Sequence, residues 1–172
     1  MENRGNLKKS IKPGLIIGAV LILMLTIWYQ NLVVRSDFSL SNGDKQEISQ
    51  YLNEEVMDPN LNGQVYSVYE VLQSNQDIGE VYIWAYIQEY YESDALLESG
   101  TGMSLPMVLH VERVGDSLEV KSHVLPRDGS YYSEDIKTLF PRRIQNKIHD
   151  YPSKNMENLV VEIENKVNAN NE

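Results

Sequence analysis

The segment "VYIWAYIQEYYE", Val81–Glu92, decides how this chain folds. Its aliphatic and aromatic residues alternate, and a period of two is typical of a β-strand with two different faces. The aliphatic side chains are predicted to face the core: Val81, Ile83, Ala85 and Ile87. The rings are predicted to form a half-exposed aromatic face: Tyr82, Trp84, Tyr86 and Tyr90.

Working outward from this strand, taken as Glu80–Glu92, three more runs have strand character: Gln64–Leu72, Ser104–Val114 and Ser117–Leu125. The segments "QSNQDIG" and "SDALLESGTGM" are rich in turn formers and are expected to be loops. Gly115 and Asp116 fit a two-residue type II′ hairpin turn. Such short links predict a four-stranded antiparallel meander.

Helical patterns flank the strands. The first is expected from about Asp44, in "GDKQEISQYLNEEVM", and helical signals resume at Ser133, a predicted N-cap, and at Pro141, a predicted first helical residue. A last helix is expected over Asn155–Asn168, with an apolar stripe on one side: Met156, Leu159, Val160, Ile163 and Val167. This order predicts an α+β domain in which helices cover an antiparallel sheet, with a cystatin-like or NTF2-like outline.

The N-terminal region has the pattern of a membrane helix. Pro13–Val34 carries no charge, and its length of about 33 Å as a helix suffices for a hydrocarbon core of about 30 Å. Four basic residues precede it and only Arg35 follows closely, so the positive-inside bias places the N-terminus in the cytoplasm. A cleavable signal peptide is the alternative, with Val34 and Ser36 as a weak cleavage site.

The expected organisation therefore has four parts. A cytoplasmic N-terminus (1–12) leads into a transmembrane signal-anchor helix (13–34). A stalk (35–43) then connects this anchor to an extracytoplasmic α+β domain (44–172). The predicted location is the cell membrane, which the chain crosses once, in contact with the lipid bilayer through its N-terminal helix.

Charge and composition exclude several classes of function. The 172-residue chain has a net charge of −10, and Phe38–Glu172 alone has 10 basic and 23 acidic residues, which gives −13. Such a body repels nucleic acid. The chain has no cysteine, which excludes disulfides and thiolate chemistry. Nucleophile-elbow, zinc-peptidase and Walker patterns are missing too, so no catalytic residue, metal site or cofactor is expected.

The candidate binding residues follow from the strand pairing. If Val114 pairs with Ser117, His110 lies opposite Lys121. His110 and His123 would then both lie on the aromatic side of the sheet. The candidate ligand or partner site is Tyr82, Trp84, Tyr86, Tyr90 and His110. Exposed rings stack on sugars or hold protein partners. The alternative is that the rings are only good strand formers covered by the C-terminal helices.

A second candidate is a small cluster of cations in the predicted helix after Pro141. Arg143 and Lys147 are four residues apart, with Arg142 beside them. Together they predict an anion-binding patch, although cations on a helix more often form an ordinary solvated face.

Three stretches together carry a resemblance: "VYIWAYIQEYY", "GTGMSLPMVLHV" and "PRDGSYYSEDIKTLFP". They resemble small exported proteins of Gram-positive Bacillota, which are anchored or lipid-modified at the N-terminus and have an α+β body without an assigned activity. The resemblance covers about Gln64–Ile148 and implies a bacterial cell-surface location. This chain lacks the cysteine that the acylated members carry, so the implied anchor is a helix.

The expected function is that of a non-catalytic extracytoplasmic binding domain on a single-pass membrane protein. It would serve as an accessory of another envelope protein or as a sensor-like module. One alternative is a binder of a small ligand or of cell-wall glycan or peptide through the aromatic face. The other is an unrecognised hydrolase built around His110.

Overall fold

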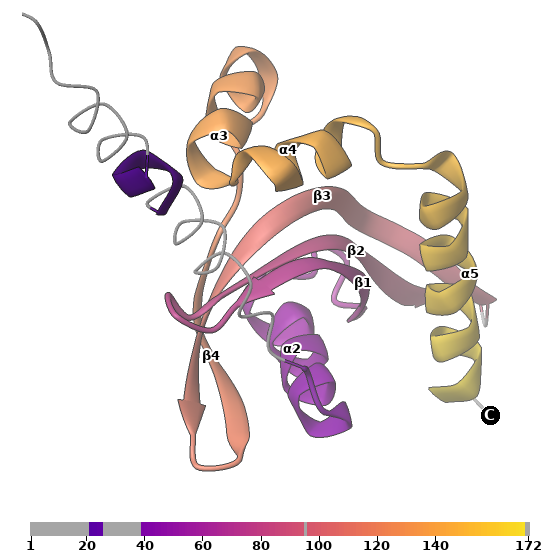
Figure 1. Cartoon of the computed structure of the whole chain (residues 1–172). Coiled ribbons are helices and arrows are strands. Elements are labelled where there is room, and N and C mark those ends of the chain that lie inside the picture. Colours follow the sequence, from indigo (N-terminus) through magenta and orange to yellow (C-terminus); the bar gives the residue numbers. More distant parts are fainter. Residues whose placement is uncertain (1–20, 26–38, 95, 171–172) are drawn as a thin grey trace, which may run out of the picture. The chain divides into compact units, whose positions relative to one another are not determined.

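The computed structural model describes residues 21–25, 39–94 and 96–170. Residues 21–25 are helical, and the other two ranges form the α+β body (Figure 1). Within the described ranges, no helix has the length and apolar character needed to cross a membrane. The predicted cytoplasmic N-terminus and all of the predicted anchor except 21–25 lie outside the described residues, so both stay predictions.

The body contains one antiparallel sheet of four strands in the order β1-β2-β3-β4. The strands are β1 (Gln64–Asn75), β2 (Glu80–Ser93), β3 (Leu96–Val114) and β4 (Ser117–Val124). The predicted α+β class and four-stranded meander are confirmed. The hairpin turn also has the predicted geometry, because Val114 pairs with Ser117 and Gly115 has a φ of +63°.

The predicted loop before Ser104 is wrong, because β3 begins at Leu96. The glycines of "SDALLESGTGM" make room for side chains of β2. A Cβ at Gly100 would lie 2.8 Å from Glu89 Oε2, and one at Gly102 would lie 2.3 Å from Gln88 Oε1. Glycine in a strand often marks such a close approach, and here the pattern was interpreted as a turn signal.

The register between β3 and β4 also differs from the prediction. The pairing shifts between His110 and Val111, which leaves Lys121 as an extra residue in β4. His110 therefore lies opposite Ser122 instead of Lys121, and His123 lies opposite Leu109. A bulge of one residue moves every later side chain to the other face.

Four helices complete the body: α2 (Asn42–Glu55), α3 (Tyr132–Leu139), α4 (Arg142–His149) and α5 (Ser153–Asn170). Helix α2 begins before the predicted Asp44, because Ser41 and Asp44 cap it reciprocally. A short 3₁₀ turn, Gly129–Tyr131, precedes α3, so Ser133 lies inside that helix and the predicted N-cap is wrong. Pro141 is the residue before α4 and not its first helical residue.

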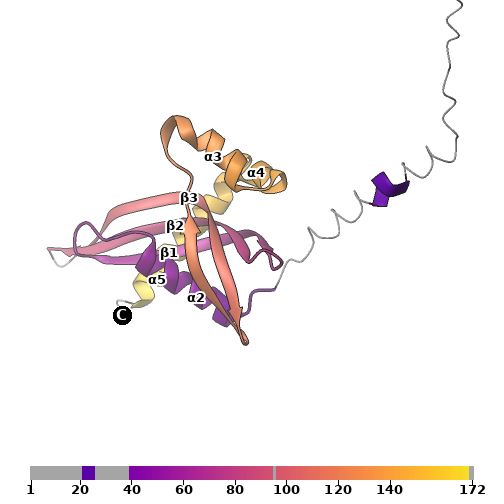
Figure 2. The same cartoon turned by 90° about the vertical axis from the view of Figure 1, so that its left-hand side faces the viewer.

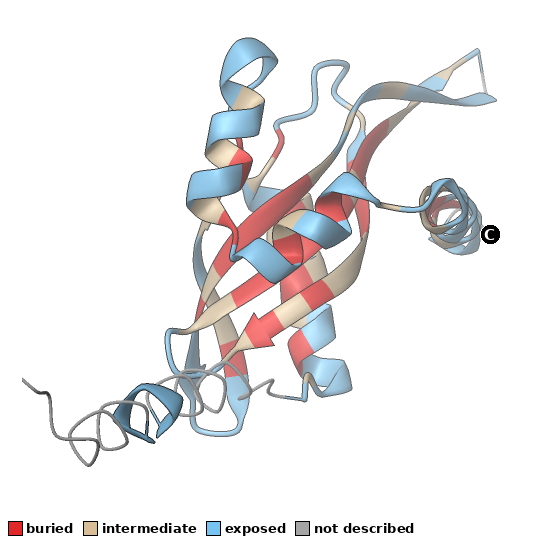
Figure 3. Cartoon of the chain, turned by 45° about the horizontal axis from the view of Figure 1, so that its top comes forward, coloured by how far each residue is buried: buried red, intermediate tan, exposed pale blue. Residues whose placement is uncertain are grey.

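Helices cover both faces of the sheet (Figures 1 and 2). Helix α2 packs Ile48 and Leu52 against the aliphatic face of β2, where Val81, Ile83, Ala85 and Ile87 are all fully buried. This confirms the predicted core face. On the other side, α3 and α4 cover one part of the aromatic face, and α5 covers another. Figure 3 shows the buried residues concentrated in the sheet between these helices.

Candidate functional site

Tyr82 belongs to the core. Its side chain is 2% exposed and packs with Phe140, which directly follows α3, and with apolar residues of α3 and α4. Its hydroxyl donates to Glu80, and burial together with this carboxylate raises the pKa of the Tyr82 hydroxyl. The prediction that all four rings are half-exposed is therefore wrong at Tyr82, because these short helices supply the apolar cover.

Trp84 is half-buried and stacked on Tyr151, a residue between α4 and α5. The ring centroids are 4.1 Å apart and the ring planes differ by 5°. Trp84 Nε1 donates to Ser104 Oγ at 2.9 Å, and the Tyr151 hydroxyl donates to Glu70 Oε2 at 2.8 Å. Burial, followed by the Glu70 carboxylate, raises the pKa of the Tyr151 hydroxyl. Both rings of the stack are thus fixed by hydrogen bonds at their polar ends.

Tyr86 and Tyr90 are half-buried beside α5. Tyr90 meets Tyr66 edge to face, with centroids 5.8 Å apart. Burial is the largest cause of the raised pKa of both hydroxyls. These two rings help to dock α5 on the sheet, and only part of each is accessible.

The two histidines predicted to lie together are on opposite faces of the sheet. His110 shares the aromatic side, where its Nδ1 lies 3.8 Å from Glu80 Oε1. His123 faces α2, its Nδ1 lies 3.0 Å from the Tyr51 hydroxyl, and burial lowers its pKa. The shift at Lys121 separates them. In the part of the chain that the structure describes, no group of three histidine or acidic side chains is placed to hold a metal ion.

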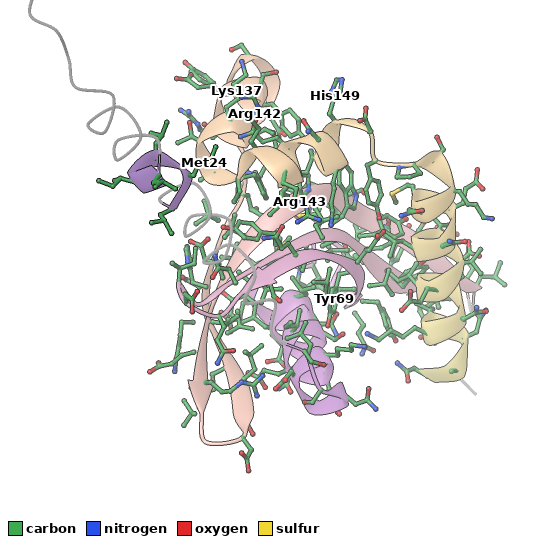
Figure 4. The ribbon with its side chains drawn as sticks, viewed as in Figure 1. Met24, Tyr69, Lys137, Arg142, Arg143 and His149 are labelled. Carbon is green, nitrogen blue, oxygen red and sulfur yellow. The ribbon has the colours of Figure 1, made fainter. Side chains whose placement is uncertain are left out.

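One residue of the predicted anion patch, Lys147, contacts the sheet instead. Lys147 Nζ donates to the backbone carbonyl of Leu72, so this ammonium group caps the edge of β1. Arg142 and Arg143 are exposed on α4. Figure 4 labels both, together with Lys137 of α3. Whether the two arginines bind an anion stays a prediction.

The structure also shows an open groove of about 740 Å³ beside Trp84, which the sequence did not predict. Its lining is mainly apolar: Trp84, Ile148, Tyr151, Pro152, Met156, Val160 and Val161, with His149, Ser153 and Glu157 as polar members. Val161 is 55% exposed there. Two smaller hollows, of about 440 and 480 Å³, have charged residues such as Lys137, Glu162 and Lys166 in their lining.

Sequence reasoning missed most of this groove. Met156 and Val160 belong to the predicted apolar stripe of the last helix, and both are only half-buried. Val161 lies one position outside that stripe, so an apolar residue there was a weak indication of a binding surface. Tyr151 gave no indication in the sequence, because its stacking on Trp84 is a contact between distant parts of the chain.

Two buried carboxylates, Glu89 and Asp44, have structural partners. Glu89 is completely buried and accepts hydrogen bonds from the backbone N–H groups of Asn60, Leu61, Gly63 and Thr101. Asp44 is 2% exposed and accepts from the backbone of Ser41 and Leu118 and from Arg113. Both side chains hold loops and helices in place, so neither is assigned to a site.

The stack makes a spectroscopic prediction. In a protein carrying Trp28→Phe, Trp84 is the one remaining tryptophan, and we expect moderately blue-shifted emission that acrylamide quenches only partly. Replacing Tyr151 with alanine should shift the emission to the red and increase quenching, because one ring face is uncovered. Thr138→Ala, on the exposed surface of α3, is the control and should change neither. Equal quenching with and without Tyr151 would contradict the stacked arrangement.

Comparisons with models of known families, with curated proteins and with solved structures gave no match, so the groove is interpreted from its own residues.

Proposed function

We propose that the α+β body is a non-catalytic binding domain and that the groove beside Trp84 receives apolar side chains of a protein partner. The observation that carries this proposal is an accessible apolar groove built on a fixed floor, the stack of Trp84 on Tyr151. Protein interfaces are commonly organised around aromatic and methionine side chains in such positions. A rigid floor also limits the entropy that binding costs.

The chemistry of the groove favours apolar side chains over sugars. A sugar stacks on a ring face, and Tyr151 leaves no more than one face of Trp84 for it. The walls contributed by Met156, Val160 and Val161 are apolar and offer few hydrogen bonds for hydroxyl groups. Burying aliphatic side chains against them contributes about 25 cal/mol per Å² of apolar surface.

The proposal includes a location. The uncharged run Pro13–Val34 anchors the chain in the membrane, and the body lies on the extracytoplasmic side, where it binds another envelope protein as an accessory or sensor-like module. The four basic residues before the run, against only Arg35 close after it, support this orientation. Protease added to wall-stripped cells should digest the body. A fully protected body would contradict the orientation.

The binding chemistry can be tested with small probes. In the Trp28→Phe protein, the peptide acetyl-Leu-Lys-Leu-amide should shift Trp84 emission in a saturable way, because its leucines enter the groove. A tri-N-acetylglucosamine oligosaccharide should not. Val161→Asp should abolish the peptide response, since it places a charge in the apolar wall, whereas Val114→Asp, at the similarly exposed hairpin turn of β3 and β4, should retain it.

The opposite pattern would reverse the assignment. A response to the oligosaccharide alone would favour the glycan-binding alternative. A peptide response that survives Val161→Asp would place the binding outside the groove.

A further inference from the structure

The hairpin of β2 and β3 extends beyond the rest of the sheet. Pairing of β1 with β2 ends at Tyr90, and β4 pairs with β3 only from Val108 onward. The part beyond Tyr90, residues 91–94 and 96–99, is a two-stranded ribbon that we call the distal ribbon. Figure 3 shows its end largely exposed. In the described part of the chain no third strand pairs with it.

The distal ribbon carries exposed apolar side chains. Leu96 is 67% exposed and Leu97 is 42% exposed, although both are large and apolar. An isolated two-stranded ribbon gains little stability from such residues. Exposed leucines on an edge strand are typical of a surface that another chain covers.

Along the same edge, part of β3 has no neighbouring strand. From Leu96 to Met107 the side of β3 away from β2 has no strand partner among the described residues. Thr101, Gly102 and Ser104 are exposed within this stretch. The Gly100 and Thr101 carbonyls already accept from Gln88 Nε2, and the Thr101 N–H donates to Glu89 Oε2, so the free edge consists of Leu96–Ser99 and Gly102–Leu105. An edge of this kind can accept an additional strand, with main-chain hydrogen bonds supplying affinity.

The negative charge of this region indicates which kind of segment would bind there. The sequence contains no lysine or arginine between Lys45 and Arg113, whereas Glu92, Asp94 and Glu98 lie in the distal ribbon itself. Natural proteins often protect a free edge with lysines, and this edge has none. An acidic, apolar edge is complementary to a segment with lysine or arginine and aliphatic residues in alternation.

We propose that an extended basic and apolar segment of a partner protein adds to the free edge of β3 as a fifth strand. Its aliphatic residues lie against Leu97, and the aliphatic stems of its basic residues lie against Leu96, which is on the opposite face. This surface goes beyond the groove of the proposed function. Acidic repulsion disfavours a second copy of the same ribbon and disfavours anionic lipid headgroups. A lipid surface would also leave the backbone groups of the edge without partners.

The probe is the peptide acetyl-Lys-Val-Lys-Val-Lys-Val-amide, titrated into the isotope-labelled full-length protein and followed by amide chemical shifts. We expect shifts centred on residues 96–104. Leu96→Ser combined with Leu97→Ser should weaken binding at least roughly tenfold, which corresponds to the loss of two aliphatic contacts. The control Ile78→Ser, which removes a similarly exposed apolar residue, should leave the affinity unchanged.

Further measurements distinguish strand addition from other binding modes. A peptide with alternate backbone nitrogens methylated keeps its side chains but loses donors along one edge, so it should fail to bind. Val161→Asp should leave binding intact, which separates this surface from the groove. Equal binding of the methylated peptide, or affinity unchanged in the double leucine variant, would overturn the proposal. Leucine-dependent binding to phosphatidylglycerol vesicles or leucine-dependent dimerisation would overturn it in favour of lipid or a second copy.

Discussion

Glu89→Gln is expected to lower the melting temperature of the body by roughly 10 °C or more. One carboxylate oxygen of Glu89 accepts from Leu61 and Gly63, at 2.7 and 3.0 Å, and the other accepts from Asn60 and Thr101. Whichever way a glutamine amide is turned, its NH₂ group meets two backbone N–H donors. Two of the backbone donors around the buried Glu89 side chain, which hold the loop before β1 and Thr101, would thus lose their acceptor.

The effect should depend on pH in a defined direction. Burial opposes ionisation of Glu89, but the backbone N–H donors outweigh it and hold the pKa below its ordinary value of 4.5. A lowered pKa stabilises the folded state above the pKa of the unfolded chain, and this contribution is lost as the pH falls through the folded pKa. The gap between Glu89→Gln and the parent should therefore be constant above about pH 5 and shrink below that.

Thermal unfolding followed by circular dichroism between pH 3 and pH 7 measures this gap. The control is Glu92→Gln, which makes the same chemical change at an exposed position of the same strand and should shift the melting temperature very little. Equal effects of the two variants would show that the buried carboxylate is not what holds the loop.

Asp44→Ala is expected to destabilise the body by about 3 kcal/mol. Asp44 completes the capping box of α2 and joins that helix to the β3–β4 hairpin through Arg113 Nη2 and the backbone N–H of Leu118, both at 3.0 Å. Its removal leaves the buried Leu118 donor unpaired and the cap of α2 incomplete. Urea unfolding of the full-length protein measures the change in free energy.

Glu54→Ala, at an exposed position of the same helix, is the matched control and should change the free energy of unfolding by less than about 0.5 kcal/mol. Because the donors at Asp44 outweigh its burial, its pKa is lowered as well. The difference between Asp44→Ala and the parent should thus shrink in acid. A difference that grows as the pH falls would contradict this assignment.

Local sequence signals were sufficient for the architecture of the body. The alternation in Val81–Glu92 separated the aliphatic core face from the aromatic face, and Gly115 with Asp116 correctly predicted the β3–β4 turn. These features depend on neighbours in the sequence, on side-chain periodicity and on turn geometry.

The errors arose where distant residues decide the structure. Gly100 and Gly102 resembled loop residues, but they lie in a strand because Glu89 and Gln88 occupy the space that their side chains would need. The extra residue at Lys121 moved His123 to the α2 side of the sheet. The groove required Tyr151 to stack on Trp84, and no local pattern predicts that contact.

The most direct test of the groove as a partner-binding site is photo-crosslinking in cells that produce the full-length chain. A benzoylphenylalanine probe at Val161, which is 55% exposed in the groove, should give one discrete protein adduct that Val160→Asp greatly reduces. The same probe at Val114, which is 49% exposed at the β3–β4 turn, should not give this adduct. No adduct from Val161, or the same adducts from both positions, would contradict the account.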